Sequence, residues 1–492
     1  MTNLTKIITI LLMLTFPGMV WGATVYVKKI SGTVYYESGA SSCSDVTDAD
    51  TRGTLEAAAG VAGVSGVCYV CPGTYSDSDL GGSGQLDLDE AGLTFEAVRT
   101  VTISSSISTA PVRLQAAVNF KGFSVTCPDL VGTNHGIYAS DQSDGFEISN
   151  NIITCEGDTN GSQWRGISVF ADGIVSNNTI SQVRNGIMVH PDSGSGYAVL
   201  IIDNTISGLD AGTDASSDCV IFSGRSVNSF SGSIVCGNDC SGYKDDGIDL
   251  YWGSDITVRG NTIHDPNTHC SSGCDGHGIK CGSDSSSGNI IERNFLYNIT
   301  DNNGIDANAS DNVVIRNNVV LGVGEASANG IQIPVNTNGA SVYNNTVVIE
   351  STGDALNFSS SATGTLIAKN NILDKGRSGG YDLDINKATV AGGYNCLRND
   401  DAVHNEGGGS YSGHSDDLYQ TDPLFENAGG ASASDYRLQP DSPAIDSGTN
   451  TVGVLRDYEG RFRTSGSRVD IGAYEYVEVS VPPLLKTEPR DG

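Results

Sequence analysis

The sequence predicts an all-β protein: a right-handed parallel β-helix with an irregular N-terminal cap and a small C-terminal β module. Three observations lead to this fold class. A motif recurs about every 25 residues, short β-rich segments alternate with turn residues, and helical periodicity is almost absent. Each repeat would form one coil that stacks on the next at about 4.8 Å, the spacing of hydrogen-bonded strands. About 11 coils would fill residues 111–395.

Residues 1–22 have the layout of a secretory signal peptide. A lysine precedes an apolar run at 7–16, Pro17 and Gly18 interrupt the run, and small Gly22 suits a cleavage position. The run is too short to span a bilayer, and no later stretch is long and apolar enough to do so. We therefore expect a secreted or periplasmic protein that does not insert into a membrane.

Residues 23–110 are predicted to cap the first coil. They contain an Asp/Ser/Gly-rich stretch at 76–84 and a possible short helix at 51–59 that Asp50 would introduce. A polar cap is needed there because the first coil has no neighbour to cover its apolar edge.

The composition restricts both partner and compartment. With 27 basic and 58 acidic side chains, the net charge is −31, which excludes nucleic-acid binding by phosphate neutralisation. The 12 cysteines are an even number, which favours disulfides in an exported chain. Two close pairs, Cys236 with Cys240 and Cys270 with Cys274, are interpreted as local disulfides rather than as a zinc site.

Two motifs recur in step through residues 111–395. A polar-Gly-Ile motif has its glycine at 186, 247, 278, 304 and 330. An asparagine two positions before a β-branched or leucine residue recurs at Asn178, Asn204, Asn261, Asn318, Asn345 and Asn371. This pattern predicts a turn with positive φ at the asparagine, whose side chain pairs with its copies in the coils above and below.

The chain from 396 to 476 departs from the repeat and is rich in Gly, Ser and Asp. It ends in the runs DSPAIDSG (441–448), RDYEGR (456–461) and VDIGAYEY (469–476), and a short polar tail follows at 477–492. This ending resembles the choice-of-anchor module that follows bacterial β-helices. The resemblance implies an architecture and says nothing of a substrate.

Alignment of the coils on the Gly-Ile motif places charged side chains side by side. The outward column after the isoleucine reads Met188, Asp249, Lys280, Asp306 and Gln332, so Lys280 lies between Asp249 and Asp306. The turn column before the glycine reads Asn185, Asp218, Asp246, His277, Asn303 and Asn329.

Four acids, Asp218, Asp245, Asp246 and Asp249, are therefore crowded into two coils. Like charges on neighbouring strands are destabilising, so these groups must hold protons or a cation. Ca²⁺ suits them because it takes six to eight oxygen ligands in irregular geometry. The alternative is a solvated acidic face with a Lys280–Asp249 ion pair, which contributes little to stability.

Three consecutive coils carry the runs DDGID (245–249), GHGIKCG (276–282) and NGIDAN (303–308). Over about 70 residues they resemble polysaccharide lyase family nine, the calcium-dependent pectate lyases. The resemblance implies Lys280 as the catalytic base and a calcium site made of Asp218, Asp245, Asp246 and Asp249. Asp210 and Asp214 are alternatives to Asp218. His277 departs from the family, which commonly has Asn there.

The chemistry agrees with these roles. β-Elimination removes the C5 proton of a uronate, which becomes acidic when its carboxylate is neutralised by a cation. Calcium would also allow this acidic protein to bind an acidic polysaccharide. The base must be neutral, and a lysine beside a cation has a lowered pKa, so we expect Lys280 to act at alkaline pH.

Two other functions stay open. A galacturonase-like glycoside hydrolase would use Asp245 and Asp246 with His277, although the Asn-Thr-Asp element of those enzymes is absent. A non-catalytic carbohydrate-binding or adhesive β-helix is the other. We expect a monomer, and the further candidates for substrate contact are His277, Asp306, Tyr251, Arg259 and Arg293, with Arg316 an equal alternative to the arginines.

Overall fold

The computed structural model describes most of the chain. The residues it describes are 22–106, 110–127, 132–155, 162–190, 197–209, 217–223, 230–267, 275–282, 286–300, 302–324, 327–334, 336–359, 362–376, 379–400, 402–463 and 466–478. The expected signal peptide (except Gly22), Asp210, Asp214, Cys270 and Cys274 lie outside the described residues.

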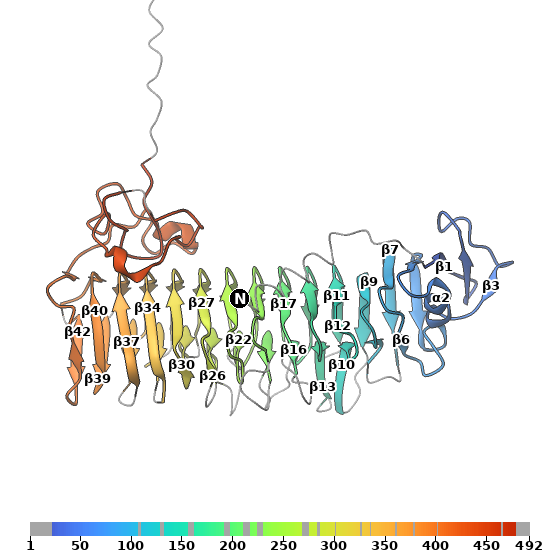
Figure 1. Cartoon of the computed structure of the whole chain (residues 1–492), viewed down its shortest axis with the longest axis horizontal. Coiled ribbons are helices and arrows are strands. Elements are labelled where there is room, and N and C mark those ends of the chain that lie inside the picture. Colours follow the sequence, from blue (N-terminus) through green and yellow to red (C-terminus); the bar gives the residue numbers. More distant parts are fainter. Residues whose placement is uncertain are drawn as a thin grey trace, which may run out of the picture.

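These residues form a long parallel β-solenoid, as the sequence predicts (Figure 1). Each coil contributes one strand to each of three columns. One column is a 13-stranded parallel sheet, here called sheet B. Its strands are β6 (Leu86–Leu88), β8 (Val112–Leu114), β10 (Gly132–Ala139), β13 (Ser162–Val169), β16 (Asn185–Val189), β19 (Val220–Phe222), β22 (Ile248–Asp249), β25 (Ile279–Lys280), β29 (Ile305–Asp306), β33 (Ile331–Ile333), β36 (Leu356–Phe358), β39 (Leu383–Asn386) and β42 (Val403–Glu406).

The other two columns belong to one 29-stranded sheet. The first column, here called A1, runs β4 (Val67–Val70), β7 (Thr94–Ser104), β9 (Asn119–Cys127), β11 (Phe146–Ser149), β14 (Gly173–Ser176), β17 (Val199–Ile202), β20 (Ile234–Cys236), β23 (Thr257–Arg259), β27 (Ile290–Glu292), β31 (Val313–Arg316), β34 (Asn338–Tyr343), β37 (Thr363–Lys369), β40 (Thr389–Gly393) and β43 (Ser410–Tyr411). The second, A2, runs β5 (Gly73–Ser76), the later halves of β7 and β9, β12 (Ile152–Cys155), β15 (Thr179–Ser181), β18 (Thr205–Ser207), β21 (Asp239–Ser241), β24 (Thr262–His264), β28 (Phe295–Tyr297), β32 (Val319–Leu321), β35 (Thr346–Val348), β38 (Ile372–Asp374), β41 (Cys396–Leu397) and β44 (Leu418–Tyr419). A short pair, β26 (Ser286–Ser287) and β30 (Ser310–Asp311), joins two of the coils.

Eleven sheet B strands, β8 to β39, begin within 111–395, which agrees with the expected number of coils. The parallel ladders also extend to the N-terminal side of residue 111, through β4, β5 and β6. The domain boundaries drawn from the sequence stay a prediction.

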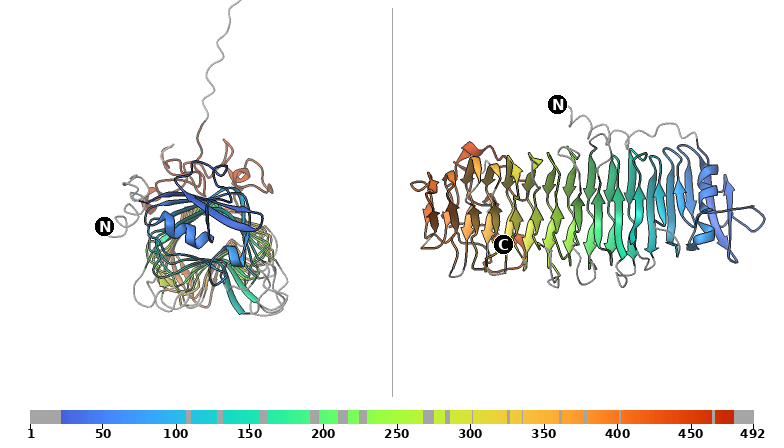
Figure 2. Two further views of the ribbon diagram at one scale, coloured as in Figure 1. Left: turned by 90° about the vertical axis from the view of Figure 1, so that its right-hand side faces the viewer. Right: turned by 90° about the horizontal axis from the view of Figure 1, so that it is seen from below.

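The N-terminal end is closed by an antiparallel unit and one helix. β1 (Thr24–Ile30) pairs with β2 (Thr33–Ser38), which pairs with β3 (Thr51–Arg52), and α2 (Leu55–Ala62) lies across the end of the solenoid (Figure 2). The helix prediction was right in kind but wrong in its start. Thr51 is in a strand, and Thr54 caps the helix by accepting a hydrogen bond from the Ala57 N–H. Threonine satisfies a free N–H there, as an N-cap should. A 3-10 turn, η1 (Asp77–Asp79), follows β5.

A ladder of buried asparagines runs along the turn between A1 and A2. Each asparagine accepts, at its Oδ1, the backbone N–H of its counterpart in the preceding coil, at 2.9–3.0 Å. Among the described residues the ladder comprises Asn151, Asn178, Asn204, Asn238, Asn261, Asn294, Asn318, Asn345, Asn371 and Asn395. The expected pairing is therefore confirmed.

The position of the positive φ was predicted wrongly by one residue. The residue before each ladder asparagine takes the left-handed conformation, and this directs the asparagine side chain inward to the ladder. These left-handed positions are Asn150, Asn177, Asp203, Gly237, Gly260, Arg293, Asn317, Asn344, Asn370 and Tyr394.

The C-terminal segment after β44, here called the C-terminal module, folds back onto the A2 side (Figure 1). Its β structure in the described residues is limited to two isolated bridges, Phe425 with Leu438 and Arg456 with Phe462; it also has two 3-10 turns, η2 (Ala433–Tyr436) and η3 (Asn450–Val452). A second apolar cluster joins it to the solenoid, formed by Phe295, Val319, Leu321, Ile372 and Cys396 with Phe425, Tyr436, Leu438, Ala444, Ile471, Ala473 and Tyr474.

Arg463 links the C-terminal module to the solenoid through hydrogen bonds. It is buried, and its Nη2 donates to Asn317 Oδ1 at 2.7 Å and to the carbonyl oxygens of Gly472 and Ala473 at 2.8 and 2.9 Å. The last coil is not covered in the same way. Within the described residues, β42, β43 and β44 each have a strand partner on one side only.

Three disulfides are present in the described chain: Cys43–Cys71, Cys127–Cys155 and Cys219–Cys240. The expected local bridge between Cys236 and Cys240 is wrong, because Cys240 points into the solenoid toward Cys219 while Cys236 ends β20 as a free thiol. Among the described helices, none has the length and apolar character needed to cross a bilayer.

Candidate metal and catalytic site

The outward column of sheet B has the register that the sequence predicts. Asp249 on β22 pairs with Lys280 on β25, and Lys280 pairs with Asp306 on β29. The isoleucine before each of them points into the core and is fully buried. Because the side chains of a strand alternate, the charged residues must point to the other side.

The turn column before sheet B is also as predicted. The N–H of Asp246 donates to Asp218 Oδ1 at 3.1 Å, and the N–H of His277 donates to Asp246 Oδ1 at 3.1 Å. Asn185 continues the series, because its Nδ2 donates to Asp218 Oδ2 at 2.8 Å. Each acid is thus held in place by the backbone or the amide of a neighbouring coil.

Three of the predicted acids form one compact group. Asp218, Asp246 and Asp249 are buried, and one carboxylate oxygen of each lies within 4.8 Å of the others. Burial raises the pKa of all three, to about 7 for Asp249. Asp246 Oδ2 and Asp249 Oδ1 have no hydrogen-bond donor, although both atoms are buried. Buried, unsatisfied carboxylate oxygens that converge in this way fit a hard cation such as Ca²⁺.

A second group shares Asp246 and is more exposed. It consists of Asp245, Asp246 and Asp275, again within 4.8 Å. Asp245 Oδ1 accepts the N–H of Asp275 at 2.7 Å, and burial raises the pKa of Asp245. The sequence analysis missed Asp275. Asp275 could have been found by alignment of the coils, because it lies two residues before His277 just as Lys244 lies two residues before Asp246. The longer segment between β24 and β25 obscures that alignment.

Lys280 projects into this acidic surrounding. Its Nζ lies 3.6 Å from Asp246 Oδ2 and forms an ion pair with Asp275; Asp249, the partner expected from the sequence, contributes through its charge. Burial of the amine lowers the pKa of Lys280, but the charges of Asp246, Asp275 and Asp249 outweigh burial and hold this pKa above its ordinary value. Without a bound cation these carboxylates keep the amine protonated, and the lowered pKa expected beside a cation stays a prediction.

His277 and Asp306 lie beside Lys280, on the same edge. His277 Nε2 is 3.6 Å from Asp306 Oδ2, and burial lowers the pKa of His277. The carboxylate of Asp306 is fixed by the Nδ2 of Asn303 at 3.0 Å and the N–H of Asn308 at 2.8 Å. Tyr251 is exposed, and its ring stands edge-on to that of Trp252.

Arg259 and Arg293 do not lie at this site. Arg259 ends β23 and Arg293 follows β27, so both belong to column A1, whereas Lys280 belongs to sheet B. They line a separate pocket with residues of the C-terminal module. The sequence could have predicted this location. Arg259 lies two residues before the ladder asparagine Asn261, and Arg293 lies one residue before Asn294. The ladder asparagines mark the turn between A1 and A2.

A basic group that the sequence analysis largely missed lies along the same sheet B face. His135 pairs in register with Arg165, and Arg165 with Asn185, which contacts Asp218. Arg165 Nη1 donates to His190 Nε2 at 3.1 Å. Burial and the charge of Arg165 lower the pKa of His135 to about 4 and that of His190 to about 3. The guanidinium thus stands as a cation between two neutral imidazoles.

Among the comparisons with known proteins, only the comparison with solved structures finds similar proteins. No protein-family model and no curated protein matches the chain. It is similar to the crystal structure of pectate lyase Pel9A at 16% identity, over 85% of this chain and 90% of that one, with a TM-score of 0.44. It is also similar to an alginate lyase from Paenibacillus sp. str. FPU-7 (16% identity, 59% and 92%, TM-score 0.35) and to the Dettilon tailspike protein (16% identity, 69% and 61%, TM-score 0.46).

Proposed function

We propose that this protein is a secreted, calcium-dependent lyase that cleaves a uronic-acid polymer, pectate or polygalacturonate first, by β-elimination. One observation carries the proposal: the Lys280 amine lies 3.6 Å from Asp246, a member of a buried group of three carboxylates with unsatisfied oxygens. A base beside a hard-cation site is the combination that proton removal next to a carboxylate needs.

Asp218, Asp246 and Asp249 would hold the cation, with Asp245 at its more exposed side. Bound Ca²⁺ would neutralise the substrate carboxylate and so make the adjacent C5 proton acidic. Lys280 would take that proton as the neutral amine, and the bond from C4 to the glycosidic oxygen then breaks. The acids that raise the pKa of Lys280 would bind the cation instead, so they would stabilise the ammonium form of Lys280 less.

Further substrate carboxylates have a place along the same face. Arg165, with neutral His135 and His190 around it, offers a guanidinium toward the N-terminal side of the acid group. Arginine binds a carboxylate with two parallel hydrogen bonds, which suits repeated uronate units. His277 and Asp306 would contact the sugar beside Lys280.

The decisive experiment is a turnover assay on polygalacturonate, alginate and glycosaminoglycans, with calcium and with a chelator. We expect ultraviolet absorbance from an unsaturated product on one of these polymers, present with calcium and absent with the chelator. Lys280→Ala should lower kcat at least 1,000-fold, about 4 kcal/mol of transition-state stabilisation, while polymer binding persists. Lys369→Ala, a lysine of column A1, is the control and should keep full activity. Equal turnover of Lys280→Ala and wild type would refute the role of Lys280.

A glycoside hydrolase is the second candidate, because the structure does bring Asp245, Asp246 and His277 together. A hydrolase would release reducing ends without ultraviolet absorbance, and the chelator would not affect it. Binding without any turnover on these polymers would instead indicate an adhesive β-helix.

Export is proposed with the function. The three disulfides are typical of an oxidising compartment, which fits a secreted or periplasmic polysaccharide-degrading enzyme. A monomer remains the predicted state.

A further inference from the structure

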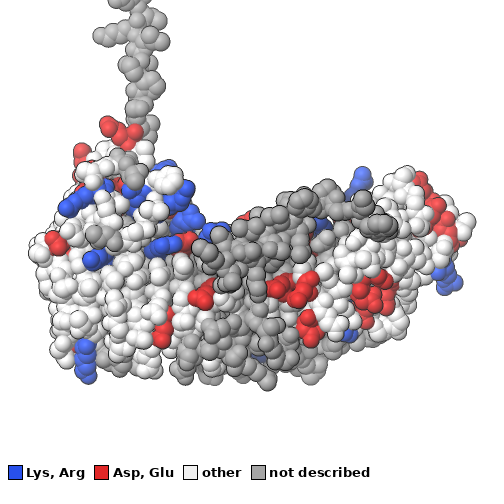
Figure 3. Space-filling model, in the orientation of Figure 1, with Lys and Arg blue, Asp and Glu red and all other residues white. Residues whose placement is uncertain are grey.

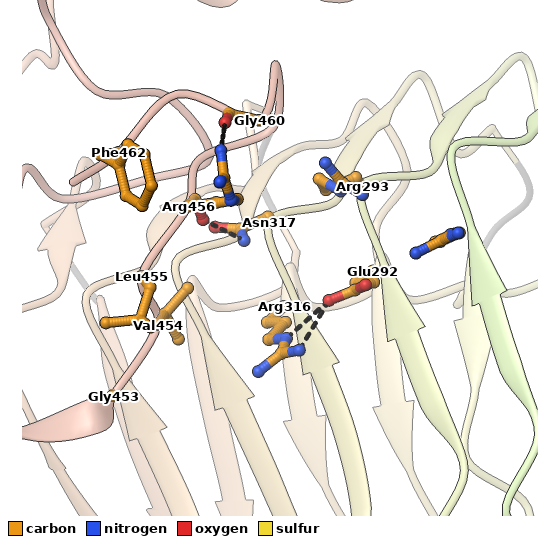
Figure 4. Close-up of a pocket in the computed structure, with 11 residues that line it drawn as sticks. Glu292, Arg293, Arg316, Asn317, Gly453, Val454, Leu455, Arg456, Gly460 and Phe462 are labelled. Atoms are coloured by element: carbon orange, nitrogen blue, oxygen red, sulfur yellow. Dashed lines mark hydrogen bonds and ion pairs between the residues drawn. The ribbon is translucent and has the colours of Figure 1, made fainter. Parts of the chain in front are cut away.

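A groove lies where the C-terminal module meets column A1, well apart from Lys280. One cavity of about 610 Å³ is lined from the solenoid by Arg259, Glu292, Arg293, Arg316 and Asn317, and from the module by residues between Gly453 and Phe462 (Figure 4). A second cavity of about 420 Å³ shares Arg259 and Arg293 and extends to Cys236 and Tyr458. Arg259 and Arg293 line both cavities, so the two cavities adjoin, and together they are here called the arginine groove.

The charge of this groove is opposite to that of the protein. Four arginines, Arg259, Arg293, Arg316 and Arg456, face a single acid, Glu292, in a chain of net charge −31. Glu292 is already bound by Arg316 Nη2 at 2.7 Å. Figure 3 shows basic side chains gathered at the base of the C-terminal module.

Two of the guanidinium groups lack a carboxylate partner among the described residues. No carboxylate of the described chain forms an ion pair with Arg259 or Arg293, and both are only half-exposed. A cation placed in a partly enclosed site without a counter-charge is suited to an incoming anion.

The backbone of Arg293 supports a dedicated role. Its φ is 55°, in a column whose other left-handed residues are Asn, Asp or Gly, with Tyr394 the one further exception. Asparagine and glycine adopt this conformation readily, whereas a long side chain does so at a cost of about 1 kcal/mol. Arg293 thus holds a backbone conformation that is less favourable for a long side chain than for asparagine or glycine.

The module supplies the opposite wall and the aromatic rings. Asn317 Nδ2 donates to the Arg456 carbonyl oxygen at 2.8 Å, which holds this wall against the solenoid. The Phe462 ring is 59% exposed, and the Arg456 guanidinium lies 4.0 Å from its centre. Guanidinium groups beside exposed aromatic rings suit a sugar that carries a carboxylate, because the guanidinium binds the carboxylate and the ring packs on the sugar.

We propose that the arginine groove is a second, non-catalytic binding site for a carboxylate-bearing polysaccharide chain. Arg259 and Arg293 lie on neighbouring coils, because Arg259 pairs in register with Glu292, the residue before Arg293, so their two guanidinium groups can hold one acidic chain together. The identity of the polymer as a uronan rests on the proposed function, whereas the groove itself does not.

The test separates this site from the acid group. Binding of oligogalacturonate and of a neutral oligosaccharide of equal length is measured by calorimetry on Lys280→Ala in the presence of a chelator. We expect the acidic oligomer alone to bind, with an affinity that falls as salt is raised. Arg259→Ala with Arg293→Ala should weaken it about tenfold or more, and Arg52→Ala, an exposed arginine of the N-terminal cap, should not.

Unchanged affinity in the double variant, equal binding of the neutral oligomer, or no binding at all would each overturn the proposal. Lyase turnover is assayed separately on the wild-type protein. If turnover is absent while arginine-dependent binding persists, the proposed function fails and the groove stands. If turnover is present and the double variant binds as before, the groove fails alone.

Discussion

His190 accepts a hydrogen bond from a guanidinium, which requires a neutral imidazole nitrogen. Burial and Arg165 lower its pKa from 6.5 to about 3, so the unfolded chain takes up a proton at a higher pH than the folded one. Stability is then lost as pH falls below 6.5, and the loss reaches about 3 kcal/mol at pH 4.

This loss can be measured as the midpoint of urea unfolding between pH 7 and pH 4. His190→Gln keeps an acceptor and removes the titration, so the variant should lose less stability than wild type on acidification. A variant that follows the wild-type curve would show that His190 does not hold its lowered pKa.

Asp246 is expected to link stability to calcium. Asp246→Asn removes one of three buried like charges, so the calcium-free variant should be more stable than calcium-free wild type, by about 1 kcal/mol or more. Wild type should gain about 2.7 kcal/mol from calcium at 100 times its Kd, and the variant should gain much less. Thermal melts with calcium and with a chelator measure both. Asp141→Asn, at an exposed acid, is the control that should behave as wild type.

Within one coil, the neighbouring asparagines Asn177 and Asn178 have different structural roles. Asn178 Oδ1 accepts hydrogen bonds from the N–H and the Nδ2 of Asn151, so Asn178→Ala leaves the buried Asn151 N–H without this acceptor and removes one of the two hydrogen bonds of Asn151 Nδ2. We expect a loss of about 2–5 kcal/mol in the free energy of unfolding. Asn177 is exposed and left-handed, so Asn177→Gly should cost less than about 1 kcal/mol. Urea unfolding of the pair compares them, and equal losses would contradict the ladder as a source of stability.

The register of the site could be predicted because strands repeat with a period that the Gly-Ile motif marks. Asp249, Lys280 and Asp306 follow from that motif alone. Contacts made by inserted segments could not be predicted in this way, since nothing in the repeat fixes where an insertion places its side chains. Asp275 was missed for this reason, and Arg259 and Arg293 were assigned to the wrong face because their coil position was not read against the asparagine motif.

For the molecule as a whole, Arg463 decides whether the C-terminal module stays docked. Arg463→Met would remove the buried ion pair that Nη1 forms with Glu475 at 3.4 Å, together with the hydrogen bonds from Nη2 to Asn317, Gly472 and Ala473. Such a loss costs about 3–5 kcal/mol. Limited proteolysis should then cut the variant within the module while the solenoid stays intact. Arg461→Ala, at an exposed ion pair with Glu459, should be as resistant as wild type.

The one-sided pairing of β42, β43 and β44 has a consequence for self-association. Strands with free N–H and C=O groups can pair with those of a second copy, which would join two molecules through their last coils, since β1, β2, β3 and α2 close the N-terminal end. Here the edge is kept short, at two to four residues a strand, and it carries Glu406 and a run of glycines at 407–409. Replacing Glu406 and Asn405 with valine should therefore favour a dimer, which light scattering detects as a doubled mass, with the acid group untouched.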